Sequence, residues 1–217
     1  MSLSILEQYI ETGNFQDLEL LLNSNPELLK EKTSHDISPL FLACYYNKPH
    51  ILQVILKYTT TITIHEACAA GLTQHVQLML EHKREVLNEL SSHGFTPLGI
   101  ASHFNKEDIV RILLAYKANP NIPSQNGYNQ YPIHASLSSN NTMISKMLIE
   151  AGADVNVVQH GNITPLHLAA QFGNIDLIIA LLEESADISI RNSNQETASD
   201  IALKKGFKDL AEILIVK

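Results

Sequence analysis

Apolar residues follow a helical period in two short stretches that begin near Thr164, where the chain reads TPLHLAAQFGN. Thr164 is a capping residue type, and Pro165 suits the first turn of a helix. Residues 166–170 then form an apolar stripe, and Gly173 can adopt the positive φ of a helix end. Residues 177–182 supply a second apolar face. The pattern predicts a helix, a tight turn and a second helix.

This unit recurs along the whole chain. Positions equivalent to Thr164 fall at Ser4, Ser38, Ile62, Thr96, Tyr131 and Thr197. The spacings are 34, 24, 34, 35, 33 and 33 residues. Because such a unit cannot bury its apolar faces alone, a fixed period predicts stacked repeats with a continuous core. About seven repeats would fill residues 1–217 as a single domain.

The pattern at 164–169 resembles the ankyrin repeat, which has a similar period and the signature T-P-L-H-x-A. Further matches occur at 38–40, 96–98 and 132–134, and 153–156 matches the segment that enters the family's hairpin. The resemblance implies an all-α ankyrin-repeat solenoid of helix-turn-helix units with short β-hairpin loops. Repeats 1 and 7 lack the signature, as is common at the ends of a solenoid, where an outer face meets water.

Three local features of the chain that differ from the regular repeat lead to further predictions. Only five residues lie between Leu56 and Ile62, where fourteen separate the equivalent positions later in the chain. We therefore predict a direct loop and a missing hairpin between repeats 2 and 3, either as a neutral deletion or as a functional notch. The exits 26–30 and 84–88 resemble each other, which suggests duplication of a two-repeat block. Two extra residues follow the turn signal Asn126-Gly127.

The C-terminal end is apolar for a terminal repeat, with Leu210, Ile213, Leu214 and Val216. Either a partner covers this helix or the helix frays.

Composition narrows the class of function. The chain has a formal charge of −8 and no basic cluster, which argues against nucleic-acid binding and favours basic protein partners. It has no apolar run of membrane-spanning length and no secretory leader, so we expect no membrane contact and a cytoplasmic location, although a secreted effector remains an alternative. We expect a monomer.

The sequence offers little support for catalysis. Cys44 and Cys68 align with Ala170, so we expect both thiols to be packing residues. His65, His134 and His167 recur at the fourth motif position, which favours local hydrogen bonding over convergence on one metal ion. His65 and Cys68 lie three apart, but no second pair completes a zinc site. No nucleophile, phosphate-loop or metalloprotease motif is present, and we expect no cofactor and no metal.

The resemblance implies that another protein binds on the concave side, at the turn tips and at exposed positions of the first helices. The candidate partner-binding residues are Tyr45, Tyr46, His93, Phe95, His103, Phe104, Tyr128, Gln171 and Phe172. Exposed aromatic rings often dominate interface energies. The alternative for some of them, Tyr46 and Phe104 above all, is that they pack sideways on neighbouring repeats.

These observations predict a non-catalytic protein-interaction module. A dedicated inhibitory or regulatory subunit of one enzyme is an alternative that differs only in the partner. A metal-dependent activity of surface histidines is a more remote alternative.

Overall fold

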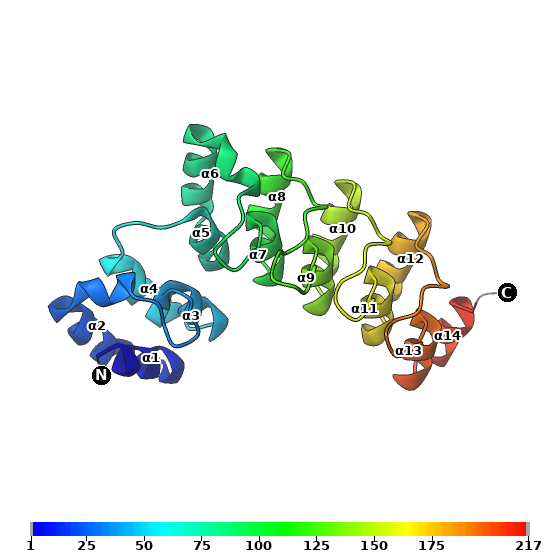
Figure 1. Cartoon of the computed structure of the whole chain (residues 1–217), viewed down its shortest axis with the longest axis horizontal. Coiled ribbons are helices and arrows are strands. Elements are labelled where there is room, and N and C mark those ends of the chain that lie inside the picture. Colours follow the sequence, from blue (N-terminus) through cyan, green and yellow to red (C-terminus); the bar gives the residue numbers. More distant parts are fainter. Residues whose placement is uncertain (1, 216–217) are drawn as a thin grey trace. The chain divides into compact units, whose positions relative to one another are not determined.

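The computed structural model describes residues 2–215, and the expected Val216 of the apolar C-terminal end lies outside this range. Within it the chain forms seven successive pairs of α-helices (Figure 1). The pairs are α1 (Ser2–Thr12) and α2 (Phe15–Ser24), α3 (Pro39–Tyr45) and α4 (Pro49–Tyr58), α5 (Ile64–Ala70) and α6 (Thr73–His82), α7 (Pro97–His103) and α8 (Glu107–Ala115), α9 (Pro132–Ser138) and α10 (Thr142–Glu150), α11 (Pro165–Phe172) and α12 (Ile175–Glu183), and α13 (Ala198–Lys204) and α14 (Lys208–Ile213). The all-α helix-turn-helix architecture is thus confirmed.

The chain divides into two compact bodies, residues 1–75 and 76–217. In the N-terminal body the core is built from leucine and isoleucine side chains of α1, α2 and α4, such as Leu6, Leu22 and Ile55, which are fully buried. In the C-terminal body the first helices α7, α9, α11 and α13 pack one against the next, and so do the second helices α8, α10 and α12. Each repeat therefore contacts mainly its neighbours, as in other solenoids.

Capping residues set the start of most first helices. The hydroxyls of Ser38, Thr96, Thr164 and Thr197 accept a hydrogen bond from the backbone N–H three residues later, at 3.0–3.3 Å. The predicted apolar face of α11 is buried, and Gly173 ends that helix at φ +63°. In three repeats an asparagine takes this left-handed position instead, which the sequence pattern did not indicate: Asn47, Asn105 and Asn140 have φ of 50–55°.

The third repeat differs from its expected register by one residue at its start. The helix cap is Thr63, not Ile62, and Glu66 completes the capping box. The end of the helix follows the expected alignment, because Gly71 donates to Cys68 O as Gly173 donates to Ala170 O. One residue is therefore missing from the first turn of α5, and Glu66 replaces histidine in the capping role.

The connections confirm the predicted departures. No hairpin separates α4 from α5; residues 59–63 form a direct loop. The exits 26–30 and 84–88 both form 3-10 helices, η1 (Pro26–Lys30) and η2 (Arg84–Asn88).

Each hairpin turn is closed across its base by a main-chain hydrogen bond of 2.8–3.0 Å, which joins residues 33 and 37, 91 and 95, 124 and 130, 159 and 163, or 192 and 196. A second main-chain hydrogen bond lies within three of these turns, from the N–H of residue 36, 94 or 195 to the carbonyl three residues earlier. The turn at 124–130 contains the two extra residues that the sequence predicts. The arms are too short for a ladder, and one isolated bridge, Gln159 with Ile163, is formed among residues 2–215.

Asparagine side chains tie successive repeats of the C-terminal body together. Asn121 Oδ1 accepts from the Asp154 N–H at 2.8 Å, and Asn156 Oδ1 accepts from the Asp187 N–H at 2.7 Å. The Asn156 side-chain amide also donates to the Ser185 carbonyl, at 3.2 Å. These bonds fix the spacing of the turns that precede each first helix.

Candidate recognition surface

The ends of the first helices in the C-terminal body present exposed side chains in four successive repeats. We call these positions the first-helix row: His103, Phe104, Ser138, Ser139, Gln171, Phe172, Lys204 and Lys205. All are exposed except Phe104, which is half-buried. They are exposed because they directly precede the left-handed residue that ends the helix, where the chain turns away from the core. The corresponding Ala69 of the third repeat is instead buried, so the row does not extend there.

Phe172 and Gln171 lie at the end of α11. The Phe172 side chain is 39% exposed although it is large and apolar. Phe104 directly follows α7, at the position equivalent to Phe172, and its ring meets the His103 ring edge-on with centroids 5.0 Å apart. His103 belongs to the same repeat, so the sideways packing of Phe104 on a neighbouring repeat stays a prediction.

The turn tips differ in how far they protrude. Tyr128, in the longer turn at 124–130, is 62% exposed, whereas His93 and Phe95 are half-buried. The Tyr128 ring meets the His160 ring at 5.7 Å, and the His160 N–H donates to the Tyr128 carbonyl at 2.8 Å. The extra length of this turn thus places an aromatic side chain in solvent beside an imidazole.

Tyr45 and Tyr46 belong to the N-terminal body, so they form a separate candidate surface. Tyr45 is 57% exposed. The Tyr46 hydroxyl donates to the Glu11 carboxylate at 2.6 Å, and this hydrogen bond raises the pKa of Tyr46. Tyr46 therefore links α3 to α1, as the sideways-packing alternative anticipated.

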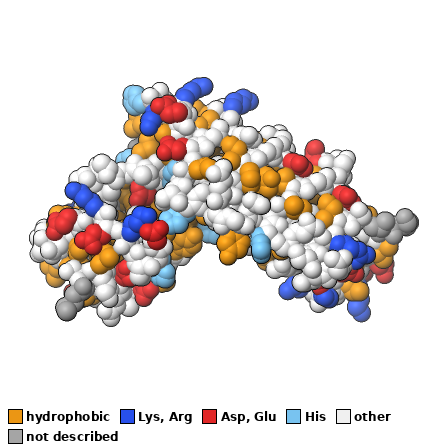
Figure 2. All heavy atoms as spheres, in the orientation of Figure 1, with side chains coloured by type: hydrophobic (Ala, Val, Ile, Leu, Met, Phe, Trp, Pro, Cys, Tyr) orange, Lys and Arg blue, Asp and Glu red, His pale blue; other side chains and the backbone are white. Residues whose placement is uncertain are grey.

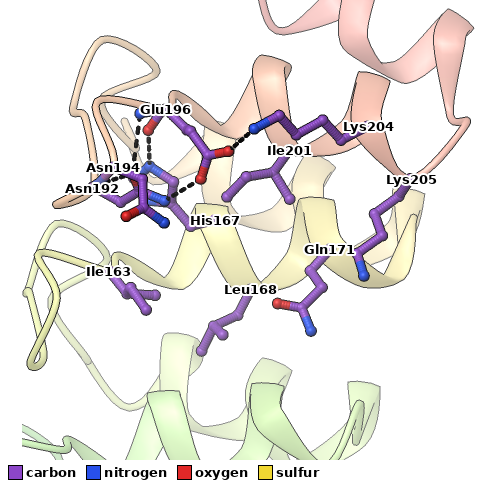
Figure 3. A pocket seen from close by; sticks show the side chains of 10 residues that line it. All are labelled: Ile163, His167, Leu168, Gln171, Asn192, Asn194, Glu196, Ile201, Lys204 and Lys205. Atoms are coloured by element: carbon purple, nitrogen blue, oxygen red, sulfur yellow. Dashed lines mark hydrogen bonds and ion pairs between the residues drawn. The ribbon is translucent and has the colours of Figure 1, made fainter.

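A pocket of about 260 Å³ lies between α11 and α13, next to the first-helix row (Figure 3). Ile163, Leu168 and Ile201 give it an apolar lining. Glu196 and Lys204 line one part, and Gln171 and Lys205 lie together away from Glu196. Of these polar residues the sequence analysis named Gln171 as a candidate, but not Glu196.

Glu196 is the acidic side chain that lines this pocket. The side-chain amide of Asn192 donates to Glu196 Oε2 at 2.9 Å, and the Lys204 ammonium donates to Oε1. These two bonds lower the pKa of Glu196 to about 2, so its carboxylate is ionised at neutral pH. The same ion pair raises the pKa of Lys204. In Figure 2 the part of the surface that carries α13 and α14 shows basic side chains next to acidic ones.

The buried histidines serve the scaffold. His167 Nδ1 accepts from the Thr164 backbone N–H at 3.1 Å, while Nε2 donates to the Glu196 carbonyl at 3.1 Å. His134 makes the equivalent pair of bonds, to the Tyr131 N–H and the Ile163 carbonyl. Burial lowers the pKa of both rings, that of His134 to about 4. The prediction of local hydrogen bonding is confirmed for these two.

The third repeat again departs from the prediction. His65 does not take the fourth motif position when the helix is counted from its cap, because Thr63 is the cap. Glu66 fills this place and accepts from the Ser38 hydroxyl at 2.6 Å, so that it joins repeats 2 and 3 within the N-terminal body. Cys68 is fully buried, as expected of a packing residue, and burial raises the pKa of its thiol; Cys44 is half-buried.

No group of three or more His, Cys, Asp or Glu side chains is arranged to hold a metal ion among residues 2–215. None of the described helices combines the length and apolarity required to cross a membrane.

Comparison with known proteins identifies what the chain resembles. A family profile for ankyrin repeats in three copies matches residues 60–124 and 133–217, and a profile for ankyrin repeats in many copies matches residues 100–149. A putative ankyrin repeat protein of Acanthamoeba polyphaga mimivirus is 27% identical over 167 residues, which cover 70% of this chain and 22% of the relative.

Two shorter matches are more similar in sequence. The human transient receptor potential cation channel subfamily A member 1 is 32% identical over 105 residues, 47% of this chain and 9% of the channel. A putative ankyrin repeat protein of Fowlpox virus is 33% identical over 84 residues, 39% of this chain and 44% of the relative. The matched part of this chain thus spans less than half the length of each of these three relatives.

Proposed function

This chain belongs to the ankyrin repeat family, and we infer that it is a non-catalytic module that binds another protein through the first-helix row and the turn tips of residues 76–217. Repeats of this family generally act as protein-interaction modules. Tyr45 provides a smaller, separate candidate contact in the N-terminal body.

The exposure of the first-helix row is the observation that carries this proposal. The row repeats through four neighbouring helices and includes Phe172, and most of its side chains are not needed for the core. Tyr128 adds a second exposed ring at a turn tip. Aromatic side chains offer large contact areas at a low cost in conformational entropy, so they are suited to be anchors of an interface. Packing between successive helices holds the row in place before a partner arrives, which limits the entropy lost on binding.

The titratable groups with strongly shifted pKa values support binding over catalysis. The rings of His134 and His167 each use both nitrogens in hydrogen bonds to the backbone. Both carboxylate oxygens of Glu196 are occupied, by Asn192 and by Lys204. Burial accounts for the lowered pKa values of the two histidines, and the hydrogen bonds from Asn192 and Lys204 account for that of Glu196, so no catalytic role is needed to explain these shifts.

Affinity capture from native cells, followed by a binding titration with the captured partner, tests the proposal. The test variant combines Phe172→Ala with Tyr128→Ala. Truncation of an interface aromatic typically costs at least about 1–2 kcal/mol, or about five- to thirty-fold in affinity. We therefore expect the captured partner to be lost or strongly reduced.

The matched control is Ile175→Ala, because Ile175 is also large, apolar and 57% exposed but lies on the second helix α12. Circular dichroism and thermal melting establish that both variants remain folded. Retention of all partners by the folded double variant, or an equal loss in the control, would contradict the proposed surface.

A further inference from the structure

The pocket between α11 and α13 has spare hydrogen-bond donors at one end. Gln171 and Lys205 line it, and neither side chain has a hydrogen-bond or ion-pair partner among the described residues. A lysine ammonium offers three donors and no acceptor, and a glutamine amide offers two donors. Because Lys204 is already paired with Glu196, the uncompensated charge of this pocket belongs to Lys205 and is positive.

The charge of the pocket is therefore opposite to that of the chain as a whole. The charges of Glu196 and Lys204 in this pocket cancel, and the ring of His167 is neutral. The positive charge of the Lys205 ammonium is therefore the one that remains. The whole chain carries a formal charge of −8. A partner attracted to this pocket is thus expected to be acidic there, even though the net charge favours basic proteins.

The apolar lining of the pocket sets a second requirement for a partner, namely an apolar side chain. Leu168 is 8% exposed, and Ile163 and Ile201 are half-buried, so the pocket offers apolar contact beside its polar groups. Small-molecule sites usually enclose about 300–1,000 Å³, whereas this pocket is smaller and partly open. Its size suits one or two side chains of a peptide.

We propose that this pocket binds a carboxylate side chain, Asp or Glu, of a partner protein at Lys205 and Gln171, with an adjacent apolar side chain of the partner seated on Leu168 and Ile201. This inference rests on the proposed function and specifies the partner's chemistry at one part of the first-helix row. An incoming lysine or arginine is disfavoured, because it would approach Lys205 and would have to displace Lys204 from Glu196.

Three synthetic peptides test the proposal on the full chain labelled with nitrogen-15. The peptides are acetyl-Ala-Ala-Leu-Glu-Ala-Ala-amide and the versions with Gln or Lys in place of Glu, each titrated up to about 10 mM because so small a contact binds weakly. We expect the Glu peptide to shift the side-chain amide of Gln171 and the backbone amides of Lys204 and Lys205. Its affinity should exceed that of the Gln peptide by about two- to five-fold, as is typical of a solvent-exposed ion pair. The Lys peptide should bind most weakly.

Two lysine variants supply the control. Lys205→Gln removes the ammonium from the pocket, whereas Lys208→Gln makes the same change in charge on exposed α14, at a residue that does not line the pocket. We expect Lys205→Gln to abolish the preference for Glu over Gln and Lys208→Gln to preserve it. Equal binding of the three peptides, a preference for Lys, or no shifts at the pocket would overturn the proposal.

Failure of the pocket proposal can be distinguished from failure of the proposed function. If Lys205→Gln binds the captured partner with the same affinity as the wild-type chain while the Phe172 and Tyr128 variant does not, the surface stands and the pocket is not its acidic subsite. If neither variant affects capture, the surface itself is wrong.

Discussion

Gly173 satisfies two constraints at once. Its φ of +63° is costly for residues with a side chain, and a Cβ built there would lie 2.6 Å from the Phe207 ring. Gly206 ends the next first helix at φ +89°, but a Cβ there meets nothing within 4 Å. A comparison of alanine variants at the two glycines therefore separates the cost of the left-handed backbone conformation from the cost of a steric clash.

We expect Gly206→Ala to lower the free energy of unfolding by about 1–2 kcal/mol, the usual penalty of the left-handed conformation. Gly173→Ala should cost more, because the Phe207 ring must also move. Urea denaturation measures both values. In a double-mutant cycle, Phe207→Ala should recover the excess cost of Gly173→Ala. Equal costs for the two glycine variants would show that the contact with Phe207 is unimportant.

His134 gives the fold a dependence on pH. Its pKa of about 4 in the folded protein lies below the value of about 6.5 expected when the chain is unfolded. Between these two values the unfolded chain binds the proton and the folded protein does not. The stability is therefore fully present above pH 6.5 and is lost as the pH falls towards 4.

The expected loss from His134 between pH 7 and pH 5 is about 2 kcal/mol. Urea denaturation at the two pH values measures it. His134→Gln removes the titrating group, so the difference in stability between pH 7 and pH 5 should shrink by about this amount, even if the variant is less stable at both. An unchanged difference would indicate that folding does not lower the pKa of His134.

At the scale of elements, side-chain bonds from asparagine couple each turn to the next. Asn156 accepts from the Asp187 N–H and donates to the Ser185 carbonyl, so both groups lose a partner in Asn156→Ala. We expect this variant to cost about 1 kcal/mol and to accelerate hydrogen exchange at the Asp187 amide. Amides of α7, in a distant repeat, serve as the internal reference. Unchanged exchange at Asp187 would mean that the bond does not restrain this turn.

Structural features that depend on a few neighbouring residues in the chain were predictable from the sequence. The helix starts at Thr164 and Thr197 follow from hydroxyl caps, and the longer turn at 124–130 follows from Asn-Gly and the repeat spacing. The cap at Thr63 was missed because an extra residue was assumed in the first turn of α5. The asparagines at left-handed helix ends were missed because glycine is the more common signal there.

The candidate surface was predictable in part. The exposure of Gln171 and Phe172 follows from their place just before the helix-ending glycine. The pairing of Glu196 with Lys204 does not, because it depends on side-chain conformations across two helical turns. Whether Tyr46 faces solvent or contacts Glu11 likewise depends on packing between repeats, which the repeat pattern does not specify.

At the scale of the whole molecule, the net charge and the charge of the proposed pocket have opposite signs. A chain with a formal charge of −8 carries a pocket whose uncompensated group is a lysine. Long-range attraction between charged proteins is screened beyond about 8–10 Å at physiological salt, so the charge close to the contact decides which side chain is accepted. We therefore propose that the first-helix row, with its local pattern of rings, amides and lysines, defines specificity.

Photo-crosslinking in native cells tests most directly whether the first-helix row contacts the partner. A photoreactive phenylalanine analogue replaces Phe172 in one variant of the full chain and Ile175 in another, so that the two probes lie on the first and second helices of the same repeat. We predict a discrete covalent adduct with another protein from position 172 and none from position 175. Adducts from position 175 alone, or from neither position while the protein is folded and expressed, would contradict the assignment of this surface.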